Sequence, residues 1–411
     1  MTANDSNKSK EGLDMKPFSI AKDVFWVGAI HPELRLFDDL FPTKHGTTYN
    51  SYLVKGQNKI ALIDTVKGIF APDFMANLKT VCDPAKIDYL IVNHTEPDHS
   101  GSFQEFLKIN PNITVVITKP GALFLQELTN SKFNVLEASD ELSIDLGGRT
   151  LKFVIAPFLH WPDTMFTYLA EDQVLFPCDA FGSHYYSEAG MFNDTAGDFN
   201  EDFAFYFDCL VRPFKKKVLL AIAKVKDVPV KVIAPSHGPI HRVDPLQYVK
   251  KYQEFSTVMK LPNGKKSILV LYLSAHKNTD KLTRQIAAGL KTEKTEVKVI
   301  HIPEVSLDQI RDELEKADGL LIGSPTINRD IPKPVWDVLG LFQTVSLELK
   351  LAAAYGSFGW SGEAVKMIED RLKSLKLKTF EPGYKVNFAP TEENLAKARE
   401  FGQKFAEAML V

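Results

Sequence analysis

Cysteine is scarce in this chain, since only Cys82, Cys178 and Cys209 occur among its 411 residues. No two of them form a C-x-x-C pair, which excludes a rubredoxin-type or other all-thiolate metal site within the sequence. The low number also favours a reducing compartment, because small secreted domains typically depend on disulfides. A metal site in this chain would therefore need nitrogen or oxygen ligands.

Long apolar runs are missing as well. No stretch reaches the roughly 18 apolar residues that a membrane-spanning helix needs. The first ten residues are polar and have no apolar segment behind them, so they do not form a secretion signal. We expect residues 1–16 to be flexible, and we expect the protein to be cytoplasmic with no membrane association.

The chain also lacks an excess of charge of one sign. It has 49 Lys and Arg residues against 52 Asp and Glu residues, which gives a formal net charge of −3. A protein with this balance has no overall basic field to hold a phosphate backbone. Nucleic acid is therefore not an expected partner.

The length and the pattern of apolar residues predict two α/β domains. At roughly 150 residues per domain, 411 residues correspond to two or three domains. Short strand-like runs dominate the first part, whereas apolar runs alternate with amphipathic helices from Ser267 onward. That alternation is typical of a parallel, doubly wound sheet. We place the linker at Lys260–Lys266 and expect one domain at residues 17–262 and another at 263–411.

Several helices are expected from the apolar periodicity. In the first domain they cover Ala71–Val81, Gly101–Lys108 and Asn200–Lys224. In the second domain, Ser306 followed by Gln309 is the sequence pattern of a capping box at the start of a helix.

The densest chemical feature is the segment Asn93–Gly101, which reads NHTEPDHSG and follows the apolar run Tyr89–Val92. A tight loop at a strand end can direct alternate side chains into one site. Alternation selects His94, Glu96 and Asp98, and His99 is adjacent to them.

Three further residues occupy equivalent positions. His160, Asp179 and His237 each follow a predicted strand, which is where α/β folds gather functional loops. The alternative is a charged turn with three unrelated loop residues, and the repeated placement argues against it. The other histidines keep an ordinary surface or core role, although His31 or His184 could line a pocket; Cys178 is expected to be a small buried residue.

The pattern His-x-Glu-x-Asp-His, followed by His160, Asp179 and His237, resembles the metallo-β-lactamase superfamily over residues 20–260. The resemblance implies an αββα sandwich in which two metals share a bridging aspartate. Hydrolases of that superfamily usually carry histidine where Glu96 stands. Three carboxylates nearly neutralise two divalent ions, and their hard oxygen atoms favour iron over zinc.

On this basis we expect two non-haem iron ions. His94, Glu96 and His160 would bind one ion, Asp98, His99 and His237 would bind the other, and Asp179 would bridge them. No catalytic residue beyond these ligands is expected.

The second domain has three polar loops after successive predicted strands. The first loop leads into a helix near Thr279, and backbone N–H groups at a helix start can hold a phosphate. It lacks both G-x-G-x-x-G and the Walker lysine, which favours a mononucleotide over NAD or ATP. A flavodoxin-like strand order of 2-1-3-4-5 would bring all three loops together.

Residues 267–411 resemble flavodoxin, and the resemblance implies bound FMN. The first loop departs from the common flavodoxin pattern because it lacks the usual glycine, which leaves the phosphate donors open. Trp360 is expected to stack on the flavin, or else to be a surface or core aromatic residue. The expected FMN-binding residues are Ser274, His276, Asn278, Thr279, Pro325, Thr326, Ile327, Asn328, Ser357, Phe358, Gly359, Trp360, Ser361 and Gly362.

The two domains in this order resemble the flavodiiron proteins, also called A-type flavoproteins, in their short form without a rubredoxin extension. The resemblance implies a reductase of O2 or NO, and we favour the four-electron reduction of O2 to water over the reduction of NO to N2O. It also implies a head-to-tail homodimer or homotetramer. Electrons would come from an external donor, either a rubredoxin-like or iron–sulfur protein or a reduced deazaflavin.

Two other functions remain open. One is a zinc-dependent hydrolase with a fused flavodoxin domain, and Glu96 and the flavin loops argue against it. The other is an electron-transfer module that reduces neither gas.

Overall fold

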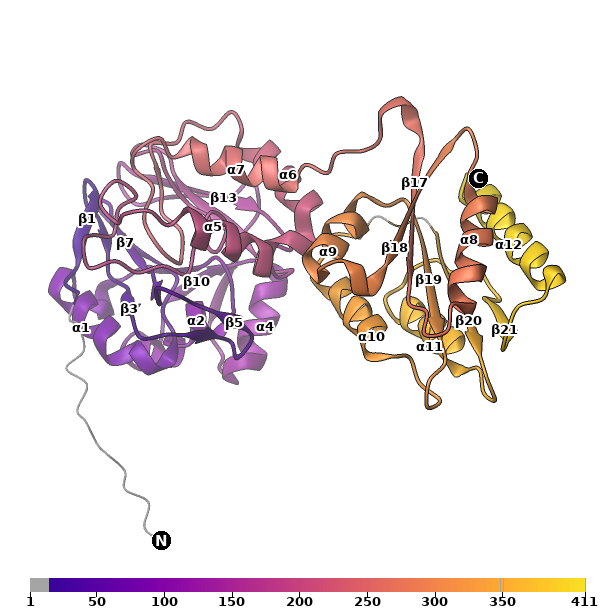
Figure 1. Ribbon diagram of the computed structural model, residues 1–411. Helices are drawn as coiled ribbons and strands as arrows, with labels where there is room; N and C mark the ends of the chain where they lie inside the picture. The colour runs from indigo at the N-terminus through magenta and orange to yellow at the C-terminus, as the bar shows by residue number, and fades with distance from the viewer. Residues whose placement is uncertain (1–14, 348, 350, 411) are drawn as a thin grey trace, which may run out of the picture. The chain divides into compact units, whose positions relative to one another are not determined.

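The computed structural model describes residues 15–347, 349 and 351–410, so most of the expected flexible segment 1–16 lies outside the described residues. The chain divides into two units between Ser256 and Thr257, a few residues before the expected boundary (Figure 1). Among the described residues, no helix combines the length and apolar character that crossing a membrane requires.

The N-terminal unit is built on two sheets. The first has seven strands in the order β1-β2-β7-β8-β9-β10-β11, and the second has five in the order β12-β13-β14-β15-β16. The strands of the first sheet are β1 (Phe18–Ala21), β2 (Val24–Trp26), β7 (Tyr52–Lys55), β8 (Ile60–Ile63), β9 (Tyr89–Val92), β10 (Thr114–Ile117) and β11 (Asn134–Glu137). Those of the second are β12 (Ser143–Asp145), β13 (Thr150–Ile155), β14 (Met165–Leu169), β15 (Val174–Phe176) and β16 (Val232–Ile233).

Each sheet is apolar on both faces, which makes four layers. In β9, Ile91 packs into the core between the sheets, whereas Leu90 and Val92 point to the helices on the other side. This period of two follows from the alternation of side chains along a strand. The helices over the first sheet are α1 (Ala71–Val81), α3 (Phe103–Ile109) and α4 (Lys119–Thr129), and those over the second are α5 (Asn200–Tyr206), α6 (Lys215–Val225) and α7 (Leu246–Ser256). The expected αββα sandwich is confirmed.

The helix expected at Asn200–Lys224 is not continuous. After α5 the chain forms a π-helical turn at Phe207–Val211 and a 3₁₀ turn at Arg212–Phe214 before α6 begins. Pro213 explains the break, because proline lacks the N–H that a helix interior needs. The expected stretch is therefore helical throughout, but it is not one α-helix.

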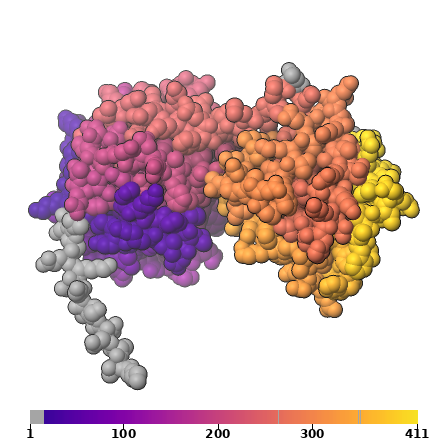
Figure 2. All heavy atoms as spheres, viewed as in Figure 1, coloured from indigo at the N-terminus to yellow at the C-terminus, as the bar shows by residue number. Residues whose placement is uncertain are grey.

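Short strands complete the N-terminal unit. Strands β3 (Ala29–His31) and β6 (Thr47–Tyr49) form one pair, and β4 (Leu36–Phe37) and β5 (Phe41–Pro42) form a small hairpin. In the space-filling view of Figure 2, this early part of the described chain, drawn in indigo, lies on the surface of the N-terminal unit.

The C-terminal unit is a parallel sheet with helices on both faces. Its strands, in the order β18-β17-β19-β20-β21, are β17 (Lys266–Tyr272), β18 (Thr295–His301), β19 (Gly319–Pro325), β20 (Leu351–Phe358) and β21 (Tyr384–Asn387). Helices α8 (Asn278–Leu290) and α12 (Glu392–Leu410) cover one face, and α9 (Leu307–Lys316), α10 (Lys333–Gly340) and α11 (Glu363–Ser374) cover the other. The expected order 2-1-3-4-5 is confirmed, and α9 begins with the expected capping box.

Candidate metal centre and flavin loops

The segment after β9 brings four polar side chains into one buried site. His94 and Glu96 follow the strand directly, and Pro97 begins α2, a single turn at Pro97–Ser100. Asp98 and His99 lie on this turn, so both adjacent residues face the site. Simple alternation along a loop does not account for His99, and the helical turn does.

The remaining side chains come from the second sheet. His160 lies beyond β13, Asp179 beyond β15 and His237 beyond β16. The structure therefore gathers all seven residues expected to be metal ligands, and it draws them from the edges of both sheets.

The first group consists of His94, Glu96, His160 and Asp179, whose ligand atoms all lie within 4.8 Å of one another. Glu96 Oε2 is 2.9 Å from His160 Nε2 and 3.3 Å from His94 Nε2. Asp179 Oδ2 is 3.8 Å from His160 Nε2 and 3.9 Å from His94 Nε2. Two imidazole nitrogens and two carboxylates thus face one point.

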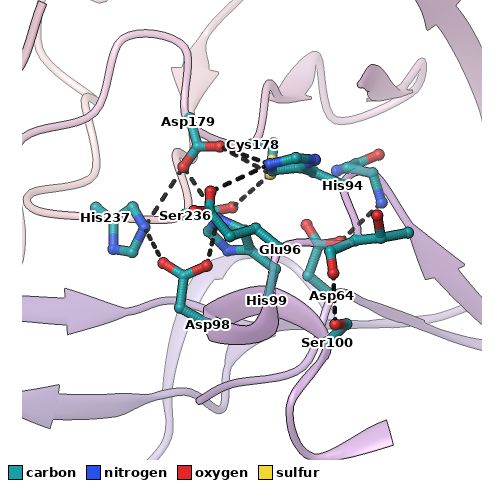
Figure 3. Close-up of polar contacts among 12 residues, drawn as sticks. Asp64, His94, Glu96, Asp98, His99, Ser100, Cys178, Asp179, Ser236 and His237 are labelled. Carbon is teal, nitrogen blue, oxygen red and sulfur yellow. Dashed lines mark hydrogen bonds and ion pairs between the residues drawn. The ribbon is translucent and has the colours of Figure 1, made fainter. Parts of the chain in front are cut away.

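The second group consists of Asp98, His99 and His237, and it meets the other oxygen of Asp179. Asp179 Oδ1 is 3.0 Å from His99 Nε2 and 3.4 Å from His237 Nε2. Asp98 Oδ2 is 3.0 Å from His237 Nε2, and Asp98 Oδ1 is 3.4 Å from His99 Nε2. Figure 3 shows Asp179 with contacts to His94 of the first group and to His237 of the second. Its two oxygens are divided between the groups, as a bridging carboxylate requires.

Buried polar atoms at this site show that a cation fits it. Both carboxylate oxygens of Asp98 and Nε2 of His99 lie in the ion-pair contacts given above, yet among the described residues none of them makes a hydrogen bond of regular geometry. Buried polar groups in proteins are normally hydrogen bonded or bound to metal. Imidazole and carboxylate ligands suit iron and other divalent transition metals.

The surrounding charge also favours cations. Burial and the neighbouring charges of Glu96 and Asp98 raise the pKa of Asp38 to about 6. Burial opposes charge on His99 as well, yet the carboxylates of Asp179 and Asp98 raise its pKa to about 10. Without a cation, the site retains protons to offset its carboxylates.

Three contacts orient the ligands, and sequence reasoning did not find them. His94 Nδ1 donates to the carboxylate of Asp163, 3.1 Å from Oδ1, which leaves Nε2 toward Glu96. His237 Nδ1 donates to the backbone carbonyl of Thr48 at 2.6 Å. The Tyr206 hydroxyl donates to Asp179 Oδ1 at 3.0 Å. Partners of this kind fix the ring orientation of a metal-binding histidine.

Asp163 itself is well anchored. Its Oδ2 accepts the backbone N–H and the side-chain hydroxyl of Thr95, both at 2.8 Å. Although burial opposes the charge of His94, its bonds to Asp163 and Glu96 raise its pKa well above the ordinary value.

Of the remaining histidines, His184 is the one that touches the ligands. Its ring centroid is 5.2 Å from that of His237 and 4.8 Å from that of Tyr206. It also lines a cavity, as the sequence allowed. His31 packs against Tyr49 and Phe70, and the ring of Tyr49 lies between His31 and His237.

Cys178 is buried beside the bridge, as expected. Its thiol lies 3.9 Å from Asp179 Oδ2 and accepts the hydroxyl proton of Ser236 at 3.4 Å. Burial and the charge of Asp179 raise the pKa of the thiol well above its ordinary value. Its sulfur also lies close to ligand atoms of His99 and Asp179, so the thiol borders the metal centre.

In the C-terminal unit, the three expected flavin loops follow the adjacent strands β17, β19 and β20. The Thr279 and Ser357 hydroxyls are 2.9 Å apart, which joins the first loop to the third. The backbone N–H of Thr326 donates to the Ser357 carbonyl at 3.0 Å, which joins the second to the third. The loops thus meet at the carboxyl edge of the sheet.

The same loops combine polar groups with exposed apolar side chains. Trp360 is 79% exposed and Ile327 is 42% exposed, so Trp360 is not a core residue. The Thr326 hydroxyl accepts the Ala364 N–H at the start of α11. Hydroxyl and backbone donors suit a phosphate, and a flat exposed indole suits an aromatic ring system. The residue types in these loops therefore fit FMN.

The chain matches two known protein families. Residues 47–238 match the ODP family beta lactamase, and residues 270–402 match flavodoxin. The αββα sandwich brings together two groups of histidine and carboxylate side chains, and a flavodoxin domain follows it. These features define the class of flavoproteins with a dinuclear metal centre.

Relatives match the chain over nearly its full length. The flavo-diiron protein FprA2 of Clostridium acetobutylicum is 38% identical over 402 residues, which is 96% of this chain and 100% of the relative. A nitric oxide reductase of Moorella thermoacetica is 35% identical over 398 residues, 95% of this chain and 98% of the relative. The chain belongs to the flavodiiron protein family and is an oxidoreductase of that family.

A solved structure has the same fold. The rubredoxin oxygen:oxidoreductase of Desulfovibrio gigas superposes with a TM-score of 0.66 at 28% sequence identity, covering 96% of this chain and 99% of that one.

Proposed function

We propose that this protein is a flavodiiron reductase that reduces O2 to water at the site around Asp179. The single observation that carries the proposal is the division of the two Asp179 oxygens between the groups of His94, Glu96 and His160 and of Asp98, His99 and His237. This arrangement supports a pair of metal ions, and the flavodoxin domain supports a flavin that feeds them.

The seven residues named above would hold two non-haem iron ions, and the three loops from Ser274 to Gly362 would hold FMN. When bound, iron would take up the gas and, together with FMN, supply the electrons for its reduction. The pairing supports O2 reduction because water formation takes four electrons, which is more than either a two-iron site or a flavin provides alone.

The protein's own residues orient the ligands and hold a proton near them. Asp163 fixes the ring of His94 so that its Nε2 points to Glu96, and the Thr48 carbonyl does the same for His237. The Tyr206 hydroxyl holds a proton at Asp179 Oδ1. Burial of His94, His99 and Asp179 to 2% exposure or less shields these ligands from bulk water, whereas the Glu96 and His160 side chains stay 13% and 12% exposed.

NO is the second candidate substrate. The Moorella thermoacetica relative is named nitric oxide reductase, whereas the Desulfovibrio gigas structure is named for oxygen and rubredoxin. The latter name supports a rubredoxin-like donor, and an iron–sulfur protein or a reduced deazaflavin would serve the same purpose. A head-to-tail homodimer or homotetramer in the cytoplasm is part of the proposal.

The test begins with metal and flavin analysis of the purified protein, where two irons and one FMN per chain are expected. The protein is then reduced anaerobically and mixed with O2 or NO in a stopped-flow instrument, and flavin reoxidation is followed. Faster reoxidation by O2 supports the proposal, and faster reoxidation by NO would replace it with NO reduction. Zinc without flavin would point to a hydrolase, and reoxidation by neither gas to an electron-transfer module.

A variant locates the reaction. Asp179→Ala should retain FMN and lose gas reduction, because it removes the residue shared by both groups. Full O2 consumption by this variant would contradict the assigned site.

A further inference from the structure

A cavity of about 300 Å³ lies between the end of the β4–β5 hairpin and α5. Most of its lining surface is apolar and includes Pro42 and Phe205, while Thr43, Lys44, His184, Glu201 and Asp202 add polar or charged groups. Its volume is several times the roughly 30 Å³ that one water molecule occupies in the liquid, so it has room for small molecules.

The exposure of the lining residues gives the cavity an outer and an inner end. Lys44 and Glu201 form an ion pair at 3.3 Å with side chains that are 73% and 88% exposed, so they mark the outer end. His184 is only 5% exposed and therefore marks the inner end.

The inner end adjoins the candidate metal centre. The ring of His184 packs against the rings of His237 and Tyr206, with centroids 5.2 and 4.8 Å away. Tyr206 in turn donates its hydroxyl proton to Asp179. The imidazole ring of His184 thus separates the cavity from the proposed ligand His237. It also separates the cavity from Tyr206, which contacts the proposed ligand Asp179.

His184 is also held by few polar contacts. Its Nδ1 is 3.0 Å from the hydroxyl of Thr47, whereas its Nε2 is buried and has no hydrogen-bond partner among the described residues. A buried ring with one bonded nitrogen depends on packing for its position, so small displacements of the ring break no second hydrogen bond.

We propose that this cavity is the path by which a small uncharged diatomic gas reaches the metal centre, and that His184 forms its inner wall. The inference rests on the proposed function and adds the route to it. Apolar walls admit an uncharged gas without loss of hydration, whereas an ion or a strongly polar substrate would lose hydrogen bonds to water there.

Xenon pressure on crystals of the purified protein tests the cavity without any turnover, because xenon occupies apolar cavities. The expected result is xenon density bounded by Pro42, Phe205 and His184. Phe205→Trp should fill the cavity and abolish that density. Leu220→Trp is the matched control, because Leu220 lies on α6, is 62% exposed and does not line the cavity.

The same variants test the route kinetically. Phe205→Trp should lower kcat/KM for the gas several-fold while kcat at saturating gas, iron content and FMN content stay unchanged, because only access is altered. Leu220→Trp should match the unaltered protein. Xenon found only elsewhere, or an unchanged kcat/KM in Phe205→Trp, would overturn the route alone. An unaltered protein that reduces neither gas would overturn the proposed function, and the route with it.

Discussion

Asp163 and Glu96 hold opposite sides of the same imidazole. The carboxylate of Asp163 accepts the Nδ1 proton of His94 at 3.1 Å, and Glu96 Oε2 lies 3.3 Å from Nε2 of the ring. The ring is therefore fixed by a residue outside the ligand set, and its ability to bind metal depends on that residue.

Asp163→Asn should weaken metal binding. The substitution removes the charge that raises the pKa of His94 and loosens the ring, and such partners typically contribute about 10–100-fold to metal affinity. Fe2+ titration of the metal-free protein would measure the loss. The variant should also release fewer protons when metal binds at pH 7, because less imidazolium is present to be displaced.

Asp194→Asn is the matched control, since Asp194 pairs with Arg242 on the surface. Equal affinity and equal proton release in the two variants would show that Asp163 does not act through His94.

Tyr206→Phe should destabilise the metal-free protein by about 2 kcal/mol, because it removes a hydrogen bond to the buried carboxylate of Asp179. Tyr185→Phe removes a comparable buried hydroxyl that donates to the neutral carbonyl of Ala196, and it should cost about 1 kcal/mol. Urea unfolding of both variants gives the comparison. The idea fails if Tyr185→Phe costs as much as Tyr206→Phe.

His241 should make the N-terminal unit sensitive to acid. Burial lowers its pKa to about 3, below the ordinary value of 6.5, so the unfolded chain binds a proton that the folded chain does not. The contribution of neutral His241 to the free energy of unfolding is fully present above pH 6.5. It decreases by about 1.4 kcal/mol per pH unit as the pH falls from 6.5 toward 3.

His241→Gln should therefore lose less stability between pH 7 and pH 5 than the unaltered protein, as measured by thermal unfolding at each pH. His276→Gln, at an exposed position, should keep the original pH dependence. An identical slope in His241→Gln would show that this histidine is not the acid-sensitive group.

Gly356→Ala should destabilise the C-terminal unit. A Cβ at this position in β20 would overlap the backbone carbonyl oxygen of Ser324 in the neighbouring strand β19. Strain of this kind typically costs about 1–3 kcal/mol. FMN should also bind more weakly, because Ser357 is the next residue.

Gly340→Ala provides the control, since a Cβ there would meet nothing within 4 Å. Thermal unfolding and flavin fluorescence measure both variants. Equal melting temperatures would exclude close packing of β19 and β20 as the reason for the glycine.

The elements that sequence predicted best are those with strong local signals. Helix α1 spans Ala71–Val81 as expected, and the pair Ser306 and Gln309 forms the expected cap of α9. Pro213 indicates that the α-helix that ends at Tyr206 cannot continue unbroken into α6. The apolar periodicity of Asn200–Lys224 nevertheless favours one continuous helix. Helix periodicity alone does not reveal a π-helical turn.

The ligands themselves were predictable because each follows a strand, whereas their partners were not. Tyr206 occupies a position with no distinctive spacing, and His184 was expected only as a residue that could line a pocket. Asp163 follows His160 closely, yet the sequence does not show which group it contacts. All three reach the site through tertiary packing. The carbonyl of Thr48 is a backbone group that no sequence pattern marks. Sequence thus indicated the binding chemistry, and the fold determined which groups orient it.

The origin of the ligands in both sheets has a mechanical consequence. Glu96 and Asp98 follow a strand of one sheet, and His160, Asp179 and His237 follow strands of the other. Cations bound by these residues would cross-link the two sheets of the sandwich. Because the unfolded chain offers no such preformed site, each bound cation would shift the folding equilibrium toward the native state. Loss of metal would then lower the stability of the packing between the two sheets as well as abolish activity.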